Sequence, residues 1–335
     1  MFTRAVFDYD AFVYAIGHAV EKKSIVVTHK QSGWEKEFDN RTQFWGHFKK
    51  KEGGYLGEVN KKKIAKGQEP ASWEDFTIVD RQTPKGTLEQ ALGTVKASIN
   101  HIVRELQVDE YMGFIGKGAS FREDRSTIIK YKGNREDALR PLLKEDIQHY
   151  INKHHNGEIV TGLEADDWCV IEGVKEGRIV VASDKDSLGC PVYTYNPDKP
   201  HMGIVDGNCY GSLEVTSKNE VRGFGRKWFY FQVAYGDNVD NYRSNSASDL
   251  EIGEKGILDM VAHATNDVES LEALVKVYKH IYPEPKEIIG WRGDKIVVDW
   301  RYVLSENWDL ARMLRHEQDH ISAEFVLRKF DLWED

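Results

Sequence analysis

Two short apolar runs that each lead into an aspartate constrain the fold of this chain most. Residues 5–7 (Ala-Val-Phe) run into Asp8, and residues 179–181 (Ile-Val-Val) are followed three positions later by Asp184. A short, uninterrupted apolar run between polar segments is typical of a strand that is buried on both faces. In open parallel sheets the residues that bind ligands lie beyond the carboxyl ends of the strands. The sequence therefore predicts that Asp8 and Asp184 meet at one edge of a sheet.

The rest of the chain alternates predicted strands with predicted helices. This alternation favours an α/β fold with a central, mostly parallel sheet flanked by helices. We place a boundary near residue 228, between an α/β core (1–227) and a mainly helical region (228–335). Within the core, residues 39–80 are polar and lysine-rich, and we interpret them as an insertion with little core of its own. The predicted elements are helices at 11–20, 87–106, 139–153 and 163–174, strands at 5–7, 111–115 and 178–182, and hairpins at 24–38 and 288–300.

Composition narrows the class of protein. Forty per cent of the 335 residues are apolar and 30% are charged, which is the profile of an ordinary globular protein. No stretch approaches the roughly 18 consecutive apolar residues that a membrane helix needs. The three cysteines are odd in number and far apart, without metal-ligand spacing. They are typical of reduced thiols, and we expect a cytoplasmic protein with no membrane partner and no secretory signal.

Charge is unevenly distributed, although the net charge is −9. Residues 49–66 carry seven lysines against two acids, and residues 117–135 carry six basic residues against two acids. Residues 164–186 carry seven acids. Lysine and arginine neutralise phosphates, whereas carboxylates hold hard cations, so the pattern fits a protein that binds both nucleic acid and metal. For residues 49–66 a solvated loop explains the charges equally well.

Acidic side chains gather in four motifs. Glu164 and Asp167 are three apart and would share one face of a helix, with Asp166 rotated by about 100°. Mg²⁺ prefers a few carboxylate ligands and keeps several waters. Carboxylates that converge from several strand ends repel one another unless a cation is bound. The candidate ligands are Asp8 with Asp10, Glu164 with Asp166 and Asp167, Asp184 with Asp186, and Asp237 with Asp240.

The order of these motifs resembles that of the 5′ nuclease superfamily, which includes flap endonucleases and phage 5′-exonucleases. The resemblance runs from Ala5 to about Leu274 and omits residues 21–105. The family's first aspartate matches Asp8, and its Glu-x-Asp-Asp helix matches residues 164–167. Its strand-Asp-x-Asp and Gly-Asp-x-x-Asp motifs match the pairs at 184–186 and 237–240. The Tyr-Lys-Gly-Asn-Arg string at 131–135 looks like part of the family's helical arch, which we place at about 117–156.

The resemblance implies hydrolysis of DNA at or near 5′ ends by a two-metal mechanism, with two Mg²⁺ ions for which Mn²⁺ substitutes. Asp8, Glu164, Asp166 and Asp184 would hold the first ion, beside Asp167, and Asp186, Asp237 and Asp240 the second. Lys132 and Arg135, with Arg122 as a further candidate, would be catalytic residues that contact the phosphate. Gly253 and Lys255 would bind duplex DNA, with K⁺ at that motif. The implied protein is a monomer acting on a DNA end, a flap or an RNA–DNA hybrid, as in phage DNA replication inside a bacterial host.

The sequence departs from the family pattern in one place. The family has an aspartate ahead of the arch, but residues 113–117 offer no acid near Ile115 or Gly116. Either Asp10 takes its place, or the first metal is held by fewer carboxylates and has a high Mg²⁺ requirement. The departure also leaves open a second class of function, a non-catalytic DNA-binding protein with the same fold. The lead-in to the duplex-binding motif, residues 243–251, lacks the family's glycines as well.

A zinc-protease string competes with the nuclease hypothesis. Residues 316–320 read His-Glu-Gln-Asp-His, and on a helix the two histidines would lie one turn apart with the glutamate as general base. Only 15 residues follow His320, which leaves little room for a third zinc ligand. Leu310, Met313, Leu314 and Ile321 instead suggest an ordinary amphipathic helix. We keep the protease as a remote alternative.

Overall fold

The computed structural model describes residues 2–47 and 50–333, and it divides the chain into two compact units. Unit 1 comprises Met1–Phe12, Lys96–Ala138 and Gln148–Asp335, and unit 2 comprises Val13–Val95 and Leu139–Ile147. The boundary that we predict near residue 228 falls inside unit 1. Lys49, one of the seven lysines of residues 49–66, lies outside the described residues.

A six-stranded sheet forms the centre of unit 1. Its strand order is β6-β5-β1-β7-β8-β9, and every neighbouring pair is parallel except the edge pair β8–β9. The α/β fold with a mostly parallel sheet is therefore confirmed. The strands are β1 (Arg4–Asp8), β5 (Glu110–Ser120), β6 (Gly157–Gly162), β7 (Ile179–Val181), β8 (Tyr193–Tyr195) and β9 (Ile204–Asp206).

Helix α7 (Ala165–Glu176) covers one face of this sheet. Val6 of β1 and Val180 of β7 share a buried apolar cluster with Cys169 and Val170 of α7. Because side chains alternate along a strand, Asp8 points to the same face as Val6. The last residue of β1 is thus directed toward the side of the sheet on which α7 begins.

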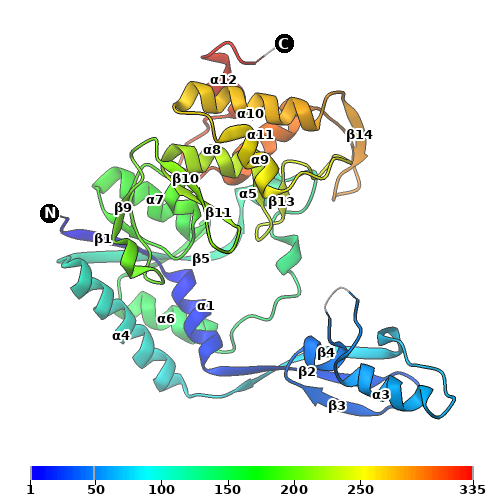
Figure 1. Cartoon of the computed structure of the whole chain (residues 1–335). Helices are drawn as coiled ribbons and strands as arrows, with labels where there is room; N and C mark the ends of the chain where they lie inside the picture. The colour runs from blue at the N-terminus through cyan, green and yellow to red at the C-terminus, as the bar shows by residue number, and fades with distance from the viewer. Residues whose placement is uncertain (1, 48–49, 334–335) are drawn as a thin grey trace. The chain divides into compact units, whose positions relative to one another are not determined.

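The C-terminal part of unit 1 is mainly helical, as predicted. Helices α8 (Gly225–Tyr235), α10 (Asp267–Ile281) and α11 (Trp300–Ala311) share one large apolar core, and Figure 1 shows them packed together beside α9 (Glu254–Val261). The hairpin of β14 (Lys286–Ile289) and β15 (Lys295–Val298) is also confirmed. The other elements of unit 1 are β10 (Ser212–Val215), β11 (Val221–Phe224), β12 (Gly236–Asp237), β13 (Tyr242–Arg243), α5 (Phe121–Arg125), α12 (Ala323–Arg328) and the short 3-10 helices η2 (Gly133–Arg135), η3 (Asp186–Gly189) and η4 (Pro200–Met202).

Unit 2 contains a three-stranded antiparallel sheet with the order β3-β2-β4 (Figure 1). The predicted hairpin at 24–38 is confirmed, and the third strand adds to it. Our interpretation of residues 39–80 as a segment with little core was wrong, because Phe44, Trp45 and Leu56 pack with Val27 and Phe38. The lysines of this segment stay outside the core, so a few apolar side chains are enough to form it despite the lysine-rich composition. The elements are β2 (Glu21–His29), β3 (Glu35–Phe38), β4 (Phe76–Pro84), α2 (Arg41–Trp45), α3 (Gly54–Ile64) and η1 (Trp73–Asp75).

Three longer helices complete the chain, namely α1 (Tyr9–Ala19), α4 (Leu88–Leu106) and α6 (Lys144–His154). Of the predicted arch at 117–156, the structure has α5, η2 and α6, joined by irregular chain. Among the helices of the described residues, none has the length and apolar character needed to span a membrane.

The zinc-protease alternative is contradicted by the local structure. Residues 312–322 lie between α11 and α12 and form no helix, so the histidines of the string are not one helical turn apart. The predicted amphipathic helix through Ile321 is wrong for the same reason. Asp319, inside the string, is buried and pairs with Arg312 at 2.6 Å, which ties the segment down as an irregular loop.

Candidate metal centre

Three aspartates lie where two strands end and a helix begins. Asp8 is the last residue of β1, Asp184 follows β7 by three residues, and Asp166 lies in the first turn of α7. Each accepts a hydrogen bond from a nearby backbone N–H, of Asp10 (3.0 Å), of Asp186 (3.0 Å) and of Asp167 (2.7 Å) respectively. These bonds fix each carboxylate while leaving further oxygen lone pairs available.

Burial and the repulsion of neighbouring carboxylates raise the pKa values of Asp8 and Asp166. Burial, together with the charges of Asp10 and Asp184, raises the pKa of Asp8 to about 7. Burial and the neighbouring Glu164 and Asp167 raise the pKa of Asp166 well above its usual value. Such shifts show that the protein alone does not stabilise all the negative charges. A bound divalent cation would stabilise these charges, and carboxylate oxygens are the ligands that such a hard cation prefers.

Glu164 takes a different role from Asp166, although both belong to one motif. It caps the N-terminus of α7, and its carboxylate forms ion pairs with Lys132 and with Arg122 (3.0 Å). Burial acts to raise the pKa of Glu164, but the charges of Arg122 and Lys132 outweigh it and lower that pKa. The hydroxyl of Tyr131 lies 3.1 Å from Glu164 and shares its single proton between Glu164 and Asp240. Glu164 therefore holds the basic segment in place.

The segment 131–135 is tied to the loop 237–241 by its backbone and by its side chains. Lys132 N donates to Asp240 O at 2.9 Å, and Arg135 pairs with the Asp240 carboxylate at 2.5 Å. Tyr131 Oη donates to the same carboxylate at 2.7 Å. Lys132 lies in the left-handed region, with φ 54°, which costs a non-glycine residue about 1 kcal/mol. These contacts overcome that cost and place Lys132 Nζ beside the acidic cluster.

The acids predicted for a second metal each have a side-chain partner. Lys185 Nζ lies 2.7 Å from Asp237 Oδ2, and Gln232 Nε2 donates to Asp186 Oδ1. Burial, with the charge of Asp184, still raises the pKa of Asp186 well above its usual value. Burial acts to lower the pKa of Lys185, but its bond to Asp237 outweighs this and raises it, so the lysine is charged.

Arg122 and Asp167 form a buried pair rather than an open ligand set. Two nitrogens of Arg122 lie 2.6 and 2.8 Å from the two oxygens of Asp167, and both residues are almost fully buried. Arg122 also donates to the carbonyls of Leu310 (3.0 Å) and Arg312 (2.9 Å). Glu164, Asp166 and Asp167 offer oxygens within 4.8 Å of one another, but cations already engage the first and third. These contacts differ from the metal-ligand role predicted for Asp167 and from the phosphate contact predicted for Arg122.

We expect Arg122→Met to lower the free energy of unfolding by about 3–5 kcal/mol, because it leaves the Asp167 charge buried without its partner. Arg125→Met is the matched control on the same helix. Arg125 is exposed, and its Nη1 lies 3.8 Å from Asp309 Oδ2, which is long for an ion pair. Its loss should therefore lower the free energy of unfolding by less than about 1 kcal/mol. Urea denaturation of both variants measures the difference. Equal stability of the two variants would contradict a structural role for the pair.

Asp10 lies where the sequence lacks its expected acid. Gly116 N donates to Asp10 Oδ2 at 3.1 Å, and a Cβ placed on Gly116 would come within 2.7 Å of the same oxygen. The carboxylate of Asp10 thus occupies the space that a side chain at 116 would enter. The adjacent Ile115 is fully buried in the core, so an acid at 115 would not reach the cluster without unfolding its surroundings.

This geometry supports the first of the two alternatives, in which Asp10 takes the place of the absent aspartate. We expect Asp10→Ala to raise the Mg²⁺ concentration for half-maximal activity about 10- to 100-fold, as loss of a group that orients a metal site does. Gly116→Asp should give no gain, because its side chain would collide with Asp10. A Mg²⁺ titration of both variants decides the matter. A lower Mg²⁺ requirement in Gly116→Asp would instead support the hypothesis that the first metal is held by fewer carboxylates.

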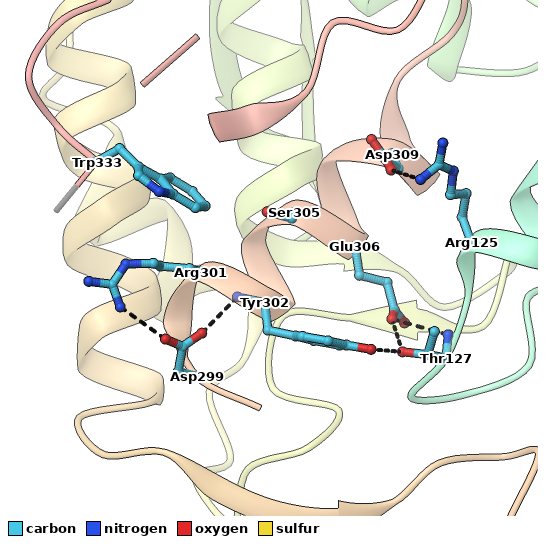
Figure 2. A pocket seen from close by; sticks show the side chains of 9 residues that line it. All are labelled: Arg125, Thr127, Asp299, Arg301, Tyr302, Ser305, Glu306, Asp309 and Trp333. Atoms are coloured by element: carbon cyan, nitrogen blue, oxygen red, sulfur yellow. Dashed lines mark hydrogen bonds and ion pairs between the residues drawn. The ribbon is translucent and has the colours of Figure 1, made fainter. Parts of the chain in front are cut away.

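A polar pocket of about 400 Å³ lies along α11 (Figure 2). Its carboxylates are engaged in structural contacts, since Asp309 pairs with Arg125 and Asp299 caps α11 at Tyr302 N. Glu306 accepts hydrogen bonds from the hydroxyl and the N–H of Thr127, as Figure 2 shows. Glu306 thus anchors the chain that continues into Tyr131 and Lys132.

The residues predicted to bind duplex DNA lie elsewhere in unit 1. Gly253 is the N-cap of α9 and Lys255 lies in its first turn, and both are exposed. Residues 262–266 connect α9 to α10, so a helix–turn–helix arrangement is present. The role of Gly253 and Lys255 stays a prediction.

The structure also assigns contacts to residues that we had not predicted individually. Tyr131 bridges Glu164 and Asp240, and Lys185 and Gln232 each engage an acid of the cluster. Tyr131 and Lys185 lie inside motifs that are recognisable in the sequence, so their positions alone could have identified them as candidate site residues. Gln232 and Glu306 lie on helices far away in sequence, and no local pattern distinguishes them.

Comparison with known proteins gives structural matches only. No family model matches the chain, and no curated protein matches it. The phage T5 D15 protein co-crystallised with metal ions matches with a TM-score of 0.35 and 14% identity, over 66% of this chain and 79% of that one. A mutant of the T5 5′-exonuclease matches with a TM-score of 0.37 and 13% identity, over 66% and 80%.

The bacteriophage T5 D15 flap endonuclease, in a pseudo-enzyme–product complex with DNA and metal ions, matches with a TM-score of 0.36 and 15% identity, over 66% and 80%. These names are those of the family that the acidic motifs resemble. Likeness at such TM-scores carries no functional argument, so the function has to be inferred from the cluster itself.

Proposed function

We propose that this protein is a metal-dependent nuclease that hydrolyses DNA phosphodiester bonds at or near 5′ ends. The observation that carries the proposal is the electrostatic coupling of acids at two strand ends and a helix start, since Asp184 acts on Asp8 and Lys132 acts on both Asp8 and Asp166. Burial and neighbouring acids raise the pKa values of Asp8 and Asp166, and costs of this kind concentrate at functional sites. The resemblance of the motifs to the 5′ nuclease superfamily supports DNA as the substrate.

Asp8, Asp166 and Asp184 would hold a divalent cation, Mg²⁺ or Mn²⁺, with Asp10 beside them. Such an ion supplies Lewis-acid stabilisation of a phosphate oxygen and lowers the pKa of water. The residues of the chain orient the substrate. Lys132 and Arg135 keep 31% and 42% of their side chains exposed while paired with Glu164 and Asp240, so they can also face an incoming phosphate. Preorganised cations of this kind stabilise charge that develops during phosphoryl transfer.

We further propose that the start of α9 contacts the duplex backbone. Gly253 and Lys255 lie at an exposed helix N-terminus, where backbone N–H groups and a lysine favour a phosphate. K⁺ at this motif, a preference for flaps or RNA–DNA hybrids, a monomeric state and a role in phage replication belong to the same proposal. They rest on the resemblance alone.

The decisive test uses 5′-labelled flap and blunt DNA duplexes with the intact protein, in Mg²⁺ and in excess chelator. The proposal expects short 5′-labelled products in Mg²⁺ and none in chelator. Binding of DNA without any product in Mg²⁺ or Mn²⁺ would support the non-catalytic alternative. Turnover that continues in chelator would exclude the metal-dependent mechanism.

A further inference from the structure

The acids of the cluster fall into two groups according to their partners. Asp8, Asp166 and Asp184 accept hydrogen bonds from backbone N–H groups, and within residues 2–47 and 50–333 none of the three forms an ion pair with a lysine or arginine. The acids of the other group each have a side-chain donor or cation. Asp186 has Gln232, Asp237 has Lys185, and Asp240 has both Arg135 and Tyr131.

Lys185 is placed to act on this second group. It lies between Asp184 and Asp186 in sequence, and its Nζ is 2.7 Å from Asp237 Oδ2. Its backbone is held as well, because Trp228 Nε1 donates to Lys185 O at 3.0 Å. Only 5% of the Asp237 side chain is exposed, so this carboxylate needs a permanent cation.

We infer that the ammonium group of Lys185 takes the place of a second divalent cation, so that this protein holds one metal ion where two would be expected. The inference rests on the proposed function of a metal-dependent nuclease. The single ion is held by Asp8, Asp166 and Asp184. The residues expected to hold a second ion do not fit one, since Asp237 pairs with Lys185, Asp240 binds Arg135 and Tyr131, and Asp186 Oδ1 accepts from Gln232.

Electrostatics explains why the lysine and a second ion exclude each other. A divalent cation at Asp237 would lie within a few ångströms of the Lys185 ammonium, and like charges at that range repel strongly at a partly buried site. Asp237 Oδ1 differs from the oxygens of the first group, because it accepts two N–H groups, of Val239 at 2.6 Å and of Asp240 at 3.4 Å. Lys185 carries its charge on the chain itself, so Asp237 keeps a cationic partner at any metal concentration.

The experiment counts Mn²⁺ ions bound to the full chain by equilibrium dialysis and by the electron paramagnetic resonance of free Mn²⁺. We expect one ion per chain in the unmodified protein and two in Lys185→Met, which keeps the length of the side chain and removes its charge. Lys185→Arg and the exposed control Lys199→Met should each keep one ion. Two ions in the unmodified protein, or one ion in a folded Lys185→Met, would overturn the inference.

A second pair of variants keeps the inference testable if Lys185→Met does not fold. Asp184→Asn should weaken Mn²⁺ binding at least tenfold, whereas Asp237→Asn should leave its affinity within about twofold, since Asp237 is not a ligand. Equal weakening by the two variants would overturn the inference. Binding of no ion at all by the unmodified protein would instead contradict the proposed function, so the two failures are distinguishable.

Discussion

Replacing Asp184 by alanine is expected to reduce the rate of DNA cleavage by about a thousandfold or more, while DNA binding persists. A loss of that size corresponds to about 4 kcal/mol of transition-state stabilisation. Asp184 follows the buried strand β7 and acts electrostatically on Asp8, so its loss removes one of the few carboxylates proposed to hold the metal. Binding should persist because phosphate contacts come from basic side chains.

Asp198→Ala is the matched control for this variant. Asp198 follows the neighbouring parallel strand β8 by three residues, as Asp184 follows β7, and both side chains are exposed. Its loss removes the same charge from the same edge of the sheet and should change the rate less than about threefold. Single-turnover cleavage and a binding titration, both in Mg²⁺, measure the two effects. Equal rate losses in the two variants would mean that overall charge, and not a metal site, matters.

Lys132→Ala is expected to slow cleavage by about 10²- to 10³-fold, the usual cost of losing one preorganised donor at a developing charge. The effect should fall on the chemical step far more than on duplex affinity, because the cation is used most when charge builds on the phosphate. Alanine keeps a Cβ, so the backbone cost of φ 54° at this position is unchanged. Glu164 also keeps Arg122 as a partner, so the fold should persist.

Lys130→Ala provides the control for Lys132→Ala within the same segment. Lys130 pairs with Glu136 at the surface, and in the part of the chain that the structure describes its side chain forms no ion pair with the acids of the cluster. Its replacement should change neither rate nor affinity by more than a few-fold. Comparable losses of rate and affinity in Lys132→Ala would place Lys132 among general backbone contacts, and we would then withdraw its role in the chemical step.

Much of the sheet and of its acidic edge is predictable from the sequence. The apolar runs before Asp8 and before Asp184 indicate parallel strands, and parallel strands bring their carboxyl ends to one edge. The start of α7 adds Asp166 to the same place because α7 packs on the face toward which Asp8 points. The long helices and both hairpins follow from local periodicity, which needs no knowledge of tertiary contacts.

Local patterns fail where the partner of a residue is distant in sequence. The string at 316–320 has the spacing of a zinc helix, yet the buried pair of Arg312 and Asp319 holds it as a loop. The lysine-rich stretch 39–80 conceals a core, because composition counts its many lysines and not the few aromatic residues that pack inward. In both cases a small number of buried contacts outweighs the local signal.

The sequence by itself determined which acids could form a metal site and in what order they follow the strands, because periodicity and strand ends are local properties. Only the tertiary structure decided how those acids are used. It pairs Asp167 with Arg122 and Asp237 with Lys185, and it hydrogen-bonds Asp10 to Gly116 N. The physical reason is that a buried carboxylate takes its properties from the nearest cation or donor, and that neighbour is chosen by packing.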